Sequence, residues 1–396
     1  MSLLFESGRI ANMTVKNRFV RTAQGDGWPT LKGECTDETV NFYSQLADGG
    51  TGLLTTGASD ILEKYKVGRF VGMYSDELID GYKKLTRAVH DYDAKIVCQL
   101  HINGRANFGD AFGPSPVPVD PAGGGSPVRE LTEEEIQEFI TAFGQAARRC
   151  KEAGFDGIQF HAAHGYLIHS FLSPHDNLRK DKWGGSFDNN MRFLLECYEQ
   201  SRKAVGDDYP IMIKVSVQDY IEGGITLDLG LRYAEKISEV GFNAIETSAG
   251  VNTDRPYFYM AKGDLPANAC IFGKSKEQTR EAFKNVKGFE DDIKFEEAYF
   301  RPFAKEVKKV VKIPVVLPGG NRTVSNMEDI LKSGDADFIG LCRPLIREPD
   351  FPNKVKKWGQ KKAECLNCNR CLTTGPGPFG PTPCYQKMFR PTRMHL

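Results

Sequence analysis

The run GIQFHAAHGYL, residues 157–167, holds the densest group of side chains that can do chemistry. His161 and His164 are three residues apart, and Tyr166 follows two residues later. At the end of a strand these side chains can converge on one point. Imidazole N–H groups can stabilise a carbonyl oxygen whose negative charge grows as a nearby carbon accepts hydride, and a Tyr hydroxyl can supply a proton. A metal site is the alternative, but no carboxylate stands close by in sequence.

A glycine pair and an arginine form a second candidate site, which suits phosphate. Gly319 and Gly320 follow one apolar run, and Cys342 and Arg343 follow the next. Backbone N–H groups and an arginine fork are common phosphate ligands, and the loops after the last two strands of a barrel often supply them. The alternative is a tight turn and a surface arginine.

Four cysteines near the end of the sequence form a third group. Cys365, Cys368, Cys371 and Cys384 have the spacing C-x2-C-x2-C-x12-C, whereas the other six of the ten cysteines are scattered. In a reducing compartment such a cluster is more often a metal site than a disulfide framework. On chemistry alone, four thiolates suit tetrahedral zinc and a [4Fe–4S] cluster equally well.

Short apolar runs alternate with long amphipathic runs, and this alternation must position the three groups. Eight strand–helix repeats predict a (β/α)8 TIM barrel. A doubly wound sheet is the alternative, but the pattern G-x-G-x-x-G is missing after the first strand. Strands are predicted at 19–24, 53–58, 96–101, 157–163, 211–216, 244–249, 314–319 and 338–342, and helices at 36–48, 76–93, 132–153, 189–205, 227–240, 296–311 and 324–333.

Two long segments interrupt this alternation. Residues 102–130 and about 250–295 follow the third and sixth predicted strands, which places both at the end of the barrel where active sites lie. For the second half of 250–295, a solvated insertion is the alternative. Residues 1–358 are predicted to form the barrel, and residues 359–396 a cysteine-rich extension.

The composition excludes some classes of protein. Lys plus Arg and Asp plus Glu both number 52, so the net charge is zero, which argues against binding nucleic acid through its phosphates. The start MSLLFESGRI has no signal-peptide pattern, and no uncharged apolar stretch reaches the roughly 18 residues of a membrane helix. We therefore expect a soluble, cytoplasmic protein.

Several motifs, in order along the chain, resemble the Old Yellow Enzyme family of FMN-dependent ene-reductases. They are KNRFV at 16–20, GGTGLL at 49–54, Gln99-Leu100 with Gly104-Arg105, HAAHGYLIHSFLSP at 161–174, NLRKDKWGGS at 177–186 and GDAD at 334–337. The resemblance covers about residues 3–358. It implies that His161 and His164 bind the substrate oxygen and that Tyr166 donates the proton. The FMN contacts that it implies are Thr22, Ala23, Ala58, Gln99, Lys214, Gly319, Gly320, Cys342 and Arg343.

Three departures from the family pattern matter. Lys214 stands where the family usually carries an Arg, which keeps the charge but loses the fork. The family often shows Gln-Leu-x-His-x-Gly-Arg, whereas His101 stands one position before the His of that motif. A one-residue shift along a strand moves a side chain to the opposite face. No family role is therefore carried over to His101. Amine-oxidising relatives use a flavin-linked Cys, where this chain has Gly25, and a Tyr, where it has His161, so an enone or enoate is favoured.

The cysteine spacing is similar to that of trimethylamine dehydrogenase and 2,4-dienoyl-CoA reductase, in which it binds [4Fe–4S] beside the FMN barrel. This resemblance favours an iron–sulfur cluster over zinc. Those relatives continue into nucleotide-binding domains that this sequence lacks. We therefore expect electrons from a separate partner, such as a ferredoxin or a flavoprotein, or directly from NAD(P)H.

These features together predict an FMN-dependent ene-reductase that reduces the C=C bond of an α,β-unsaturated carbonyl compound or enoate. A CoA thioester is a further option, and the family resemblance suggests a homo-oligomer. Three alternatives stay open. They are an NAD(P)H-dependent ene-reductase with a structural zinc extension, an amine dehydrogenase or demethylase that passes electrons out through the cluster, and an electron-transfer subunit whose barrel has lost catalysis.

Overall fold

Eight parallel strands form the centre of the molecule. The computed structural model describes residues 2–25, 27–107, 109–119, 127–251, 262–263, 294–373 and 381–385. The barrel strands are β3 (Phe19–Arg21), β4 (Leu53–Asp60), β6 (Lys95–His101), β9 (Gly157–Ala162), β10 (Ile211–Ser216), β11 (Ala244–Ser248), β12 (Val315–Leu317) and β13 (Phe338–Leu341).

The sheet closes on itself. Each barrel strand pairs in parallel with its neighbour in sequence, and β3 also pairs with β13, so the first and last strands meet. The predicted (β/α)8 barrel is thereby confirmed, with all eight strands at their predicted places to within a few residues. One short strand, β5 (Val71–Gly72), pairs in parallel with the last two residues of β4, Ser59 and Asp60.

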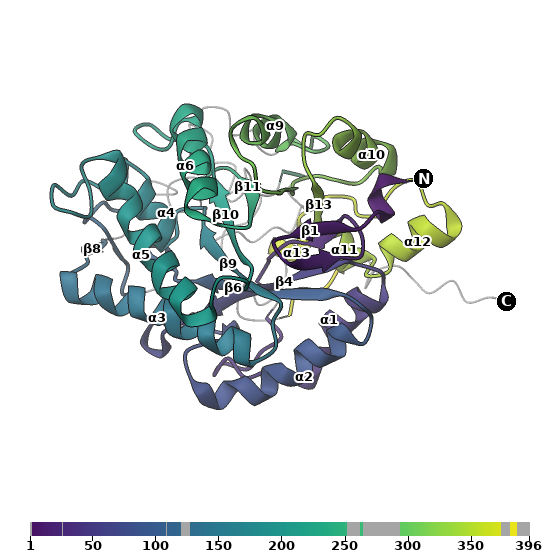
Figure 1. Cartoon of the computed structure of the whole chain (residues 1–396), viewed down its shortest axis with the longest axis horizontal. Helices are drawn as coiled ribbons and strands as arrows, with labels where there is room; N and C mark the ends of the chain where they lie inside the picture. Colours follow the sequence, from purple (N-terminus) through teal and green to yellow (C-terminus); the bar gives the residue numbers. More distant parts are fainter. Residues whose placement is uncertain are drawn as a thin grey trace.

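Helices surround the strands, as Figure 1 shows. The helices that the sequence predicted are α1 (Asp37–Asp48), α2 (Ile79–His90), α3 (Glu133–Glu152), α5 (Phe187–Val205), α6 (Leu227–Val240), α9 (Arg301–Val310) and α10 (Val324–Lys332). Sequence explains their ends. Thr132 and Glu135 form the capping box of α3, and Gly241 ends α6 in the left-handed region at φ 105°.

Shorter elements were not predicted. They are helices α4 (Leu167–Leu172), α11 (Arg343–Arg347), α12 (Phe351–Trp358) and α13 (Arg370–Thr373), the 3-10 turns η1 (Leu3–Phe5), η2 (Glu63–Tyr65) and η4 (Gly104–Ala106), and strands β1 (Gly8–Ile10), β2 (Met13–Val15), β7 (Phe112–Gly113) and β8 (Arg129–Glu130). The 3-10 turn η3 (Asp76–Leu78) forms the start of the helix predicted at 76–93. Strands β1 and β2 form an antiparallel hairpin.

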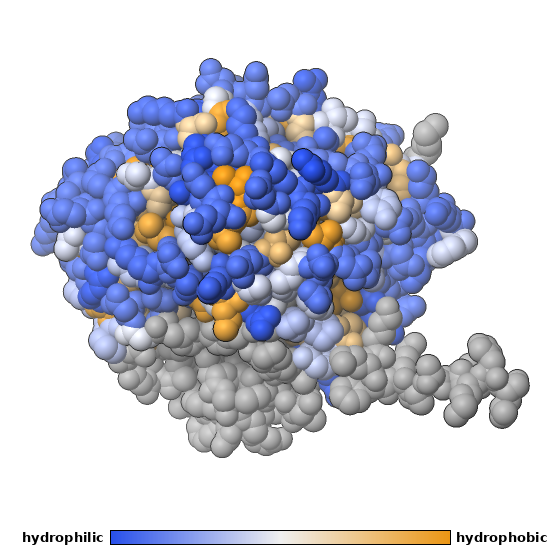
Figure 2. Space-filling model, turned by 90° about the horizontal axis from the view of Figure 1, so that it is seen from below, coloured by the Kyte–Doolittle hydropathy of each residue, from blue (hydrophilic) through white to orange (hydrophobic). Residues whose placement is uncertain are grey.

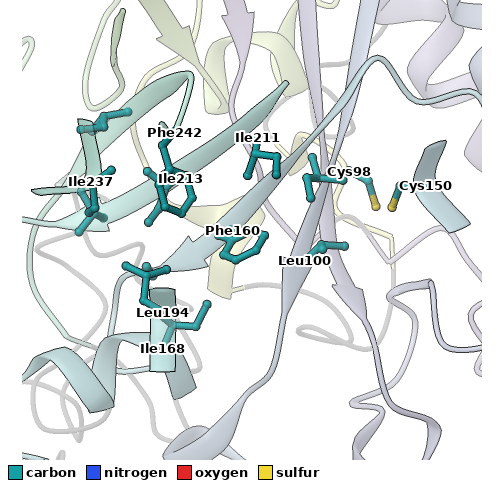
Figure 3. Packing of buried hydrophobic residues seen from close by; sticks show 14 of the residues in the cluster. Cys98, Leu100, Cys150, Phe160, Ile168, Leu194, Ile211, Ile213, Ile237 and Phe242 are labelled. Carbon is teal, nitrogen blue, oxygen red and sulfur yellow. The ribbon is translucent and has the colours of Figure 1, made fainter. Parts of the chain in front are cut away.

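The hydrophobic core has two layers. Inside the barrel, Val20, Leu53, Val97 and Met212 pack with residues of the β1–β2 hairpin, and Ile10 of that hairpin is fully buried. Outside, the strands pack against the helices in a larger cluster, in which Cys98 of β6 and Cys150 of α3 turn their sulfur atoms toward each other (Figure 3). The apolar interior layer closes the end of the barrel where the strands begin, which leaves the other end for polar side chains.

Parts of the two long segments lie within the described residues. Fully buried Arg105 forms an ion pair with Asp176 and donates to the carbonyl oxygens of Val117 and Pro118, which joins this segment to the loop after α4. Most of the segment at 250–295 lies outside the described residues.

The cysteine-rich extension contacts the barrel directly. Lys362 forms an isolated antiparallel bridge with Thr323, and the Ala363 N–H donates to the Arg322 carbonyl oxygen at 2.9 Å. These contacts attach the extension to the loop between β12 and α10.

One face of the molecule is seen in the space-filling view of Figure 2. The face in Figure 2 is largely hydrophilic, with apolar residues in small separate groups. Among the described helices, none is long and apolar enough to cross a membrane.

Candidate active site

A cavity of about 250 Å³ opens at the ends of the barrel strands. Every residue that the sequence analysis assigned to catalysis or FMN lies in its wall. They are Thr22, Ala23, Ala58, Gln99, His161, His164, Tyr166, Lys214, Gly319, Gly320, Cys342 and Arg343. The strand order therefore brings residues from seven different barrel strands to one place.

His161, His164 and Tyr166 converge where β9 ends. His164 (φ 68°) and Gly165 (φ 84°) take left-handed backbone conformations, which turn the chain from β9 into α4. The ring centres of His161 and His164 lie 5.1 Å apart, and those of His161 and Tyr166 lie 4.7 Å apart. The predicted convergence of these three side chains is present in the structure.

Both imidazoles are neutral. Burial, followed by neighbouring imidazoles and Lys214, lowers the pKa of His161 well below its usual range. Burial, followed by Lys214, does the same to the pKa of His164. The Ala163 N–H donates to His161 Nδ1 at 3.3 Å, so the ring proton of His161 belongs on Nε2.

Ser248, at the end of β11, was not found by the sequence analysis. Its Oγ lies 2.6 Å from His164 Nε2, and it also lines the cavity. A hydroxyl that donates to Nε2 leaves the ring proton of His164 on Nδ1. The sequence could have indicated Ser248, because it lies near the end of the predicted sixth strand, where the active-site residues of a barrel are found.

The sequence analysis carried no family role over to His101, because of its one-place shift from the family pattern. The structure places His101 in the cavity wall, with its ring centre 4.3 Å from that of Tyr166 and 5.1 Å from that of His161. The physical reason is strand alternation, because His101 is two residues after Gln99 and shares its face. Burial lowers the pKa of His101 to about 4, so this ring is also neutral at pH 7.

A chain of polar side chains crosses the barrel interior beside the cavity. Gln99 Nε2 donates to Gln159 Oε1 at 2.7 Å, and Gln159 Nε2 donates to Glu246 Oε2 at 3.0 Å. Lys214 Nζ lies 2.7 Å from Glu246 Oε1. The sequence analysis identified Gln99 and Lys214 but missed Gln159 and Glu246. Gln159 is two residues before His161 on β9, and Glu246 is two residues before Ser248 on β11, so each pair shares one face of its strand.

The glycine pair forms a cradle that has no room for side chains. Gly319 and Gly320 have φ of 94° and 79°, and a Cβ on Gly320 would lie 2.6 Å from the Glu296 carbonyl oxygen. Beside them, buried Asn321 Oδ1 has no hydrogen-bond partner among the described residues. Arg343 is buried at the same end and donates to the Lys262 carbonyl oxygen at 3.0 Å. Backbone N–H groups and a cation fit the phosphate of a flavin nucleotide, and the open acceptor of Asn321 fits a ribityl hydroxyl group.

Cys365, Cys368, Cys371 and Cys384 line a second, smaller cavity. Arg343 and Asn367 belong to the walls of both cavities, so the two adjoin. Cations face the thiols here, and Arg347 Nη1 lies 3.9 Å from Cys384 Sγ.

Four thiols and two arginines fit the donor chemistry of a thiolate-bound cluster. In the described part of the chain, no group of three or more His, Cys, Asp or Glu side chains is arranged to hold a metal ion.

The chain is similar in sequence to a family of flavin oxidoreductases. Residues 3–362 match the NADH:flavin oxidoreductase / NADH oxidase family. The chain is 35% identical to an NADH oxidase of Thermoanaerobacter brockii, over 92% of this chain and 52% of the relative. It is 28% identical to a cinnamate reductase of Clostridium sporogenes, over 92% of this chain and 54% of the relative.

A solved structure of 2-naphthoyl-CoA reductase with 2-naphthoyl-CoA has a TM-score of 0.78 and 27% identity, covering 93% of this chain and 54% of the other. The chain therefore spans about half the length of these three proteins.

Proposed function

This chain belongs to the NADH:flavin oxidoreductase / NADH oxidase family, and on that premise we propose that it is an FMN-dependent ene-reductase acting on α,β-unsaturated carbonyl compounds or enoates. The observation that carries the proposal is the convergence of neutral His161, neutral His164 and Tyr166 in the cavity wall. The similarity to a cinnamate reductase and to a 2-naphthoyl-CoA reductase supports this substrate class, with a CoA thioester as one form of it.

The two imidazoles bind and polarise the substrate oxygen. His161 presents Nε2–H, because its Nδ1 accepts from the backbone, and His164 presents Nδ1–H when Ser248 donates to its Nε2. Neutral donors suit this task, because they hydrogen-bond to an oxygen that gains negative charge during the reaction and form no ion pair with the carboxylate of an enoate before it. Bound reduced FMN supplies the hydride.

Tyr166 is the proton donor to the carbon next to the carbonyl group. Its ring lies 4.7 Å from that of His161 and 4.3 Å from that of His101, so the hydroxyl is held on the imidazole side of the cavity. Protonation on that side completes the addition of hydrogen across the C=C bond.

The residues proposed to hold FMN all line the same cavity. Gly319, Gly320 and Arg343 would hold the phosphate, while Gln99 and Lys214 would face the polar edge of the ring. Thr22, Ala23, Ala58 and Cys342 complete the wall.

The cysteine cavity is proposed to hold a [4Fe–4S] cluster that exchanges electrons with FMN, because it shares Arg343 and Asn367 with the FMN cavity. Zinc is the alternative occupant. A ferredoxin-like or flavoprotein partner is the proposed electron source through the cluster, and NAD(P)H is the proposed source for direct reduction of FMN.

A cofactor count combined with one half-reaction tests the proposal. We expect about one FMN, four irons and four sulfides per chain in anaerobically purified protein. After dithionite reduction, cinnamate or 2-cyclohexen-1-one should reoxidise the flavin, and Tyr166→Phe should slow this step by about 10²- to 10⁴-fold without slowing reduction by dithionite. An absence of flavin, or equal reoxidation rates in the two proteins, would contradict the proposed function.

A further inference from the structure

The buried chain from Gln99 to Lys214 includes one carboxylate, Glu246, that the ene-reductase chemistry does not use. Its side chain is fully buried, and it does not line the cavity. Lys214 does line the cavity, with 8% of its side chain exposed. The ammonium group therefore lies between the cavity and a carboxylate 2.7 Å behind it.

The contact with Glu246 changes the electrostatic effect of Lys214 on a group bound in the cavity. A lone buried cation beside the ring would strongly favour a reduced flavin that carries negative charge, because charges interact strongly where water is excluded. With Glu246 in contact, the pair has no net charge and acts on the ring as a dipole. Replacing both partners by neutral groups of similar volume should then alter the field much less than replacing either one.

Glu246 also fixes the direction of the amide chain. An ionised carboxylate only accepts hydrogen bonds, so Gln159 must turn its NH2 group toward Glu246 and its oxygen toward Gln99. Gln99 must then donate its own NH2 group to Gln159, which leaves Gln99 Oε1 as the acceptor for a donor in the cavity. The imide N–H at the polar edge of a flavin ring is such a donor.

We propose that Glu246 is a positioning residue that sets the reduction potential of the flavin, by balancing the charge of Lys214 and by orienting the Gln159–Gln99 amides. The inference rests on the proposed function in that FMN must occupy the cavity. The couple concerned is oxidised FMN plus two electrons and one proton, giving the anionic reduced form. With Glu246 in place that form is stabilised less, so the flavin is a stronger hydride donor toward a C=C bond.

Potentiometric titration of the FMN-loaded protein tests this inference. Glu246→Gln should raise the potential, with at least a tenfold shift in the reduction equilibrium, which is about 30 mV for a two-electron couple. Lys214→Met should lower the potential. The double variant Lys214→Met/Glu246→Gln should return close to the parent value, because the charge balance is restored.

The double variant keeps the inference testable if Glu246→Gln does not fold, since losing both charges is better tolerated than leaving one unpaired. If Glu246 does not act on the flavin, the double variant will show the same lowered potential as Lys214→Met, and this overturns the inference. Asp337→Asn is the matched control, because it breaks the partly exposed Lys308–Asp337 pair and should leave the potential unchanged.

Two failures are distinguishable. One FMN per chain with no shift in Glu246→Gln overturns this inference alone, whereas absence of FMN overturns it together with the proposed function.

Discussion

Replacing Ser248 by Ala is expected to weaken the oxyanion site without dismantling it. Ser248 Oγ lies 2.6 Å from His164 Nε2, and both residues are buried. Without the hydroxyl, Nε2 has lost the group that determines which ring nitrogen carries the proton. The fraction of protein with a proton on Nδ1 of His164, facing the substrate oxygen, should therefore fall.

The size of the effect follows from what is lost. One neutral hydrogen bond contributes about 0.5–1.5 kcal/mol, which corresponds to roughly a two- to tenfold change in an equilibrium constant. Deleting an oxyanion donor outright costs about 10²- to 10³-fold in rate. The fold-loss in Ser248→Ala should therefore be much smaller than the fold-loss in His164→Ala. Ser248→Thr keeps a hydroxyl, so it should recover most of what Ser248→Ala loses.

Two measurements check this ranking. Phenol binding, followed through the visible spectrum of the flavin, reports on the oxyanion site without turnover, and stopped-flow reoxidation by an enone reports on the reaction. We expect the same fold-loss in both measurements for Ser248→Ala. The reasoning is refuted if Ser248→Ala stays within experimental error of the parent in both, or if Ser248→Thr is as impaired as Ser248→Ala.

Three further predictions concern other parts of the structure. Replacing His161 and His164 together by Ala should abolish tight phenol binding while FMN remains bound, as equilibrium dialysis of both ligands can show. Burial raises the pKa of Asp60 to about 8, so the stability that comes from its protonated form is present below about pH 4 and is lost as the pH rises through 8. In urea unfolding, Asp60→Asn should therefore lose less free energy of unfolding than the parent between pH 5 and pH 8; equal losses would contradict this. Cys371→Ser should bring the iron content from about four per chain to background, and unchanged iron would exclude this cysteine as a ligand.

The sequence predicted the barrel well because its strands are buried on both faces and its helices are long and amphipathic. The elements that it missed are short. Helix α4 has six residues and no side-chain cap at Tyr166, so neither periodicity nor capping signals it. The β1 and β2 strands have three residues each and become strands only through pairing with each other inside the end of the barrel.

The candidate site was predicted where its residues are neighbours along the chain. His161, His164 and Tyr166 lie on one strand end, so their convergence needs no knowledge of other strands. Ser248 of β11 contacts His164, and Glu246 of the same strand contacts Lys214 and Gln159. These contacts depend on which strands are adjacent in the closed ring. No role was assigned to His101 because its place differs from the family motif, whereas the alternation of β6 puts it on the same face as Gln99.

The wall shared by the two cavities has a thermodynamic consequence. Arg343 and Asn367 line both cavities, so a group that fills one of them acts on side chains that the other also uses. Thermodynamic linkage requires any such coupling to be reciprocal. If the first occupant changes the affinity for the second by some factor, then the second changes the affinity for the first by the same factor. If the cysteine cavity holds the proposed cluster and the two occupants strengthen each other's binding, loss of the cluster should weaken flavin binding by the same factor as loss of the flavin weakens cluster binding. Preparations should then lose the two groups together.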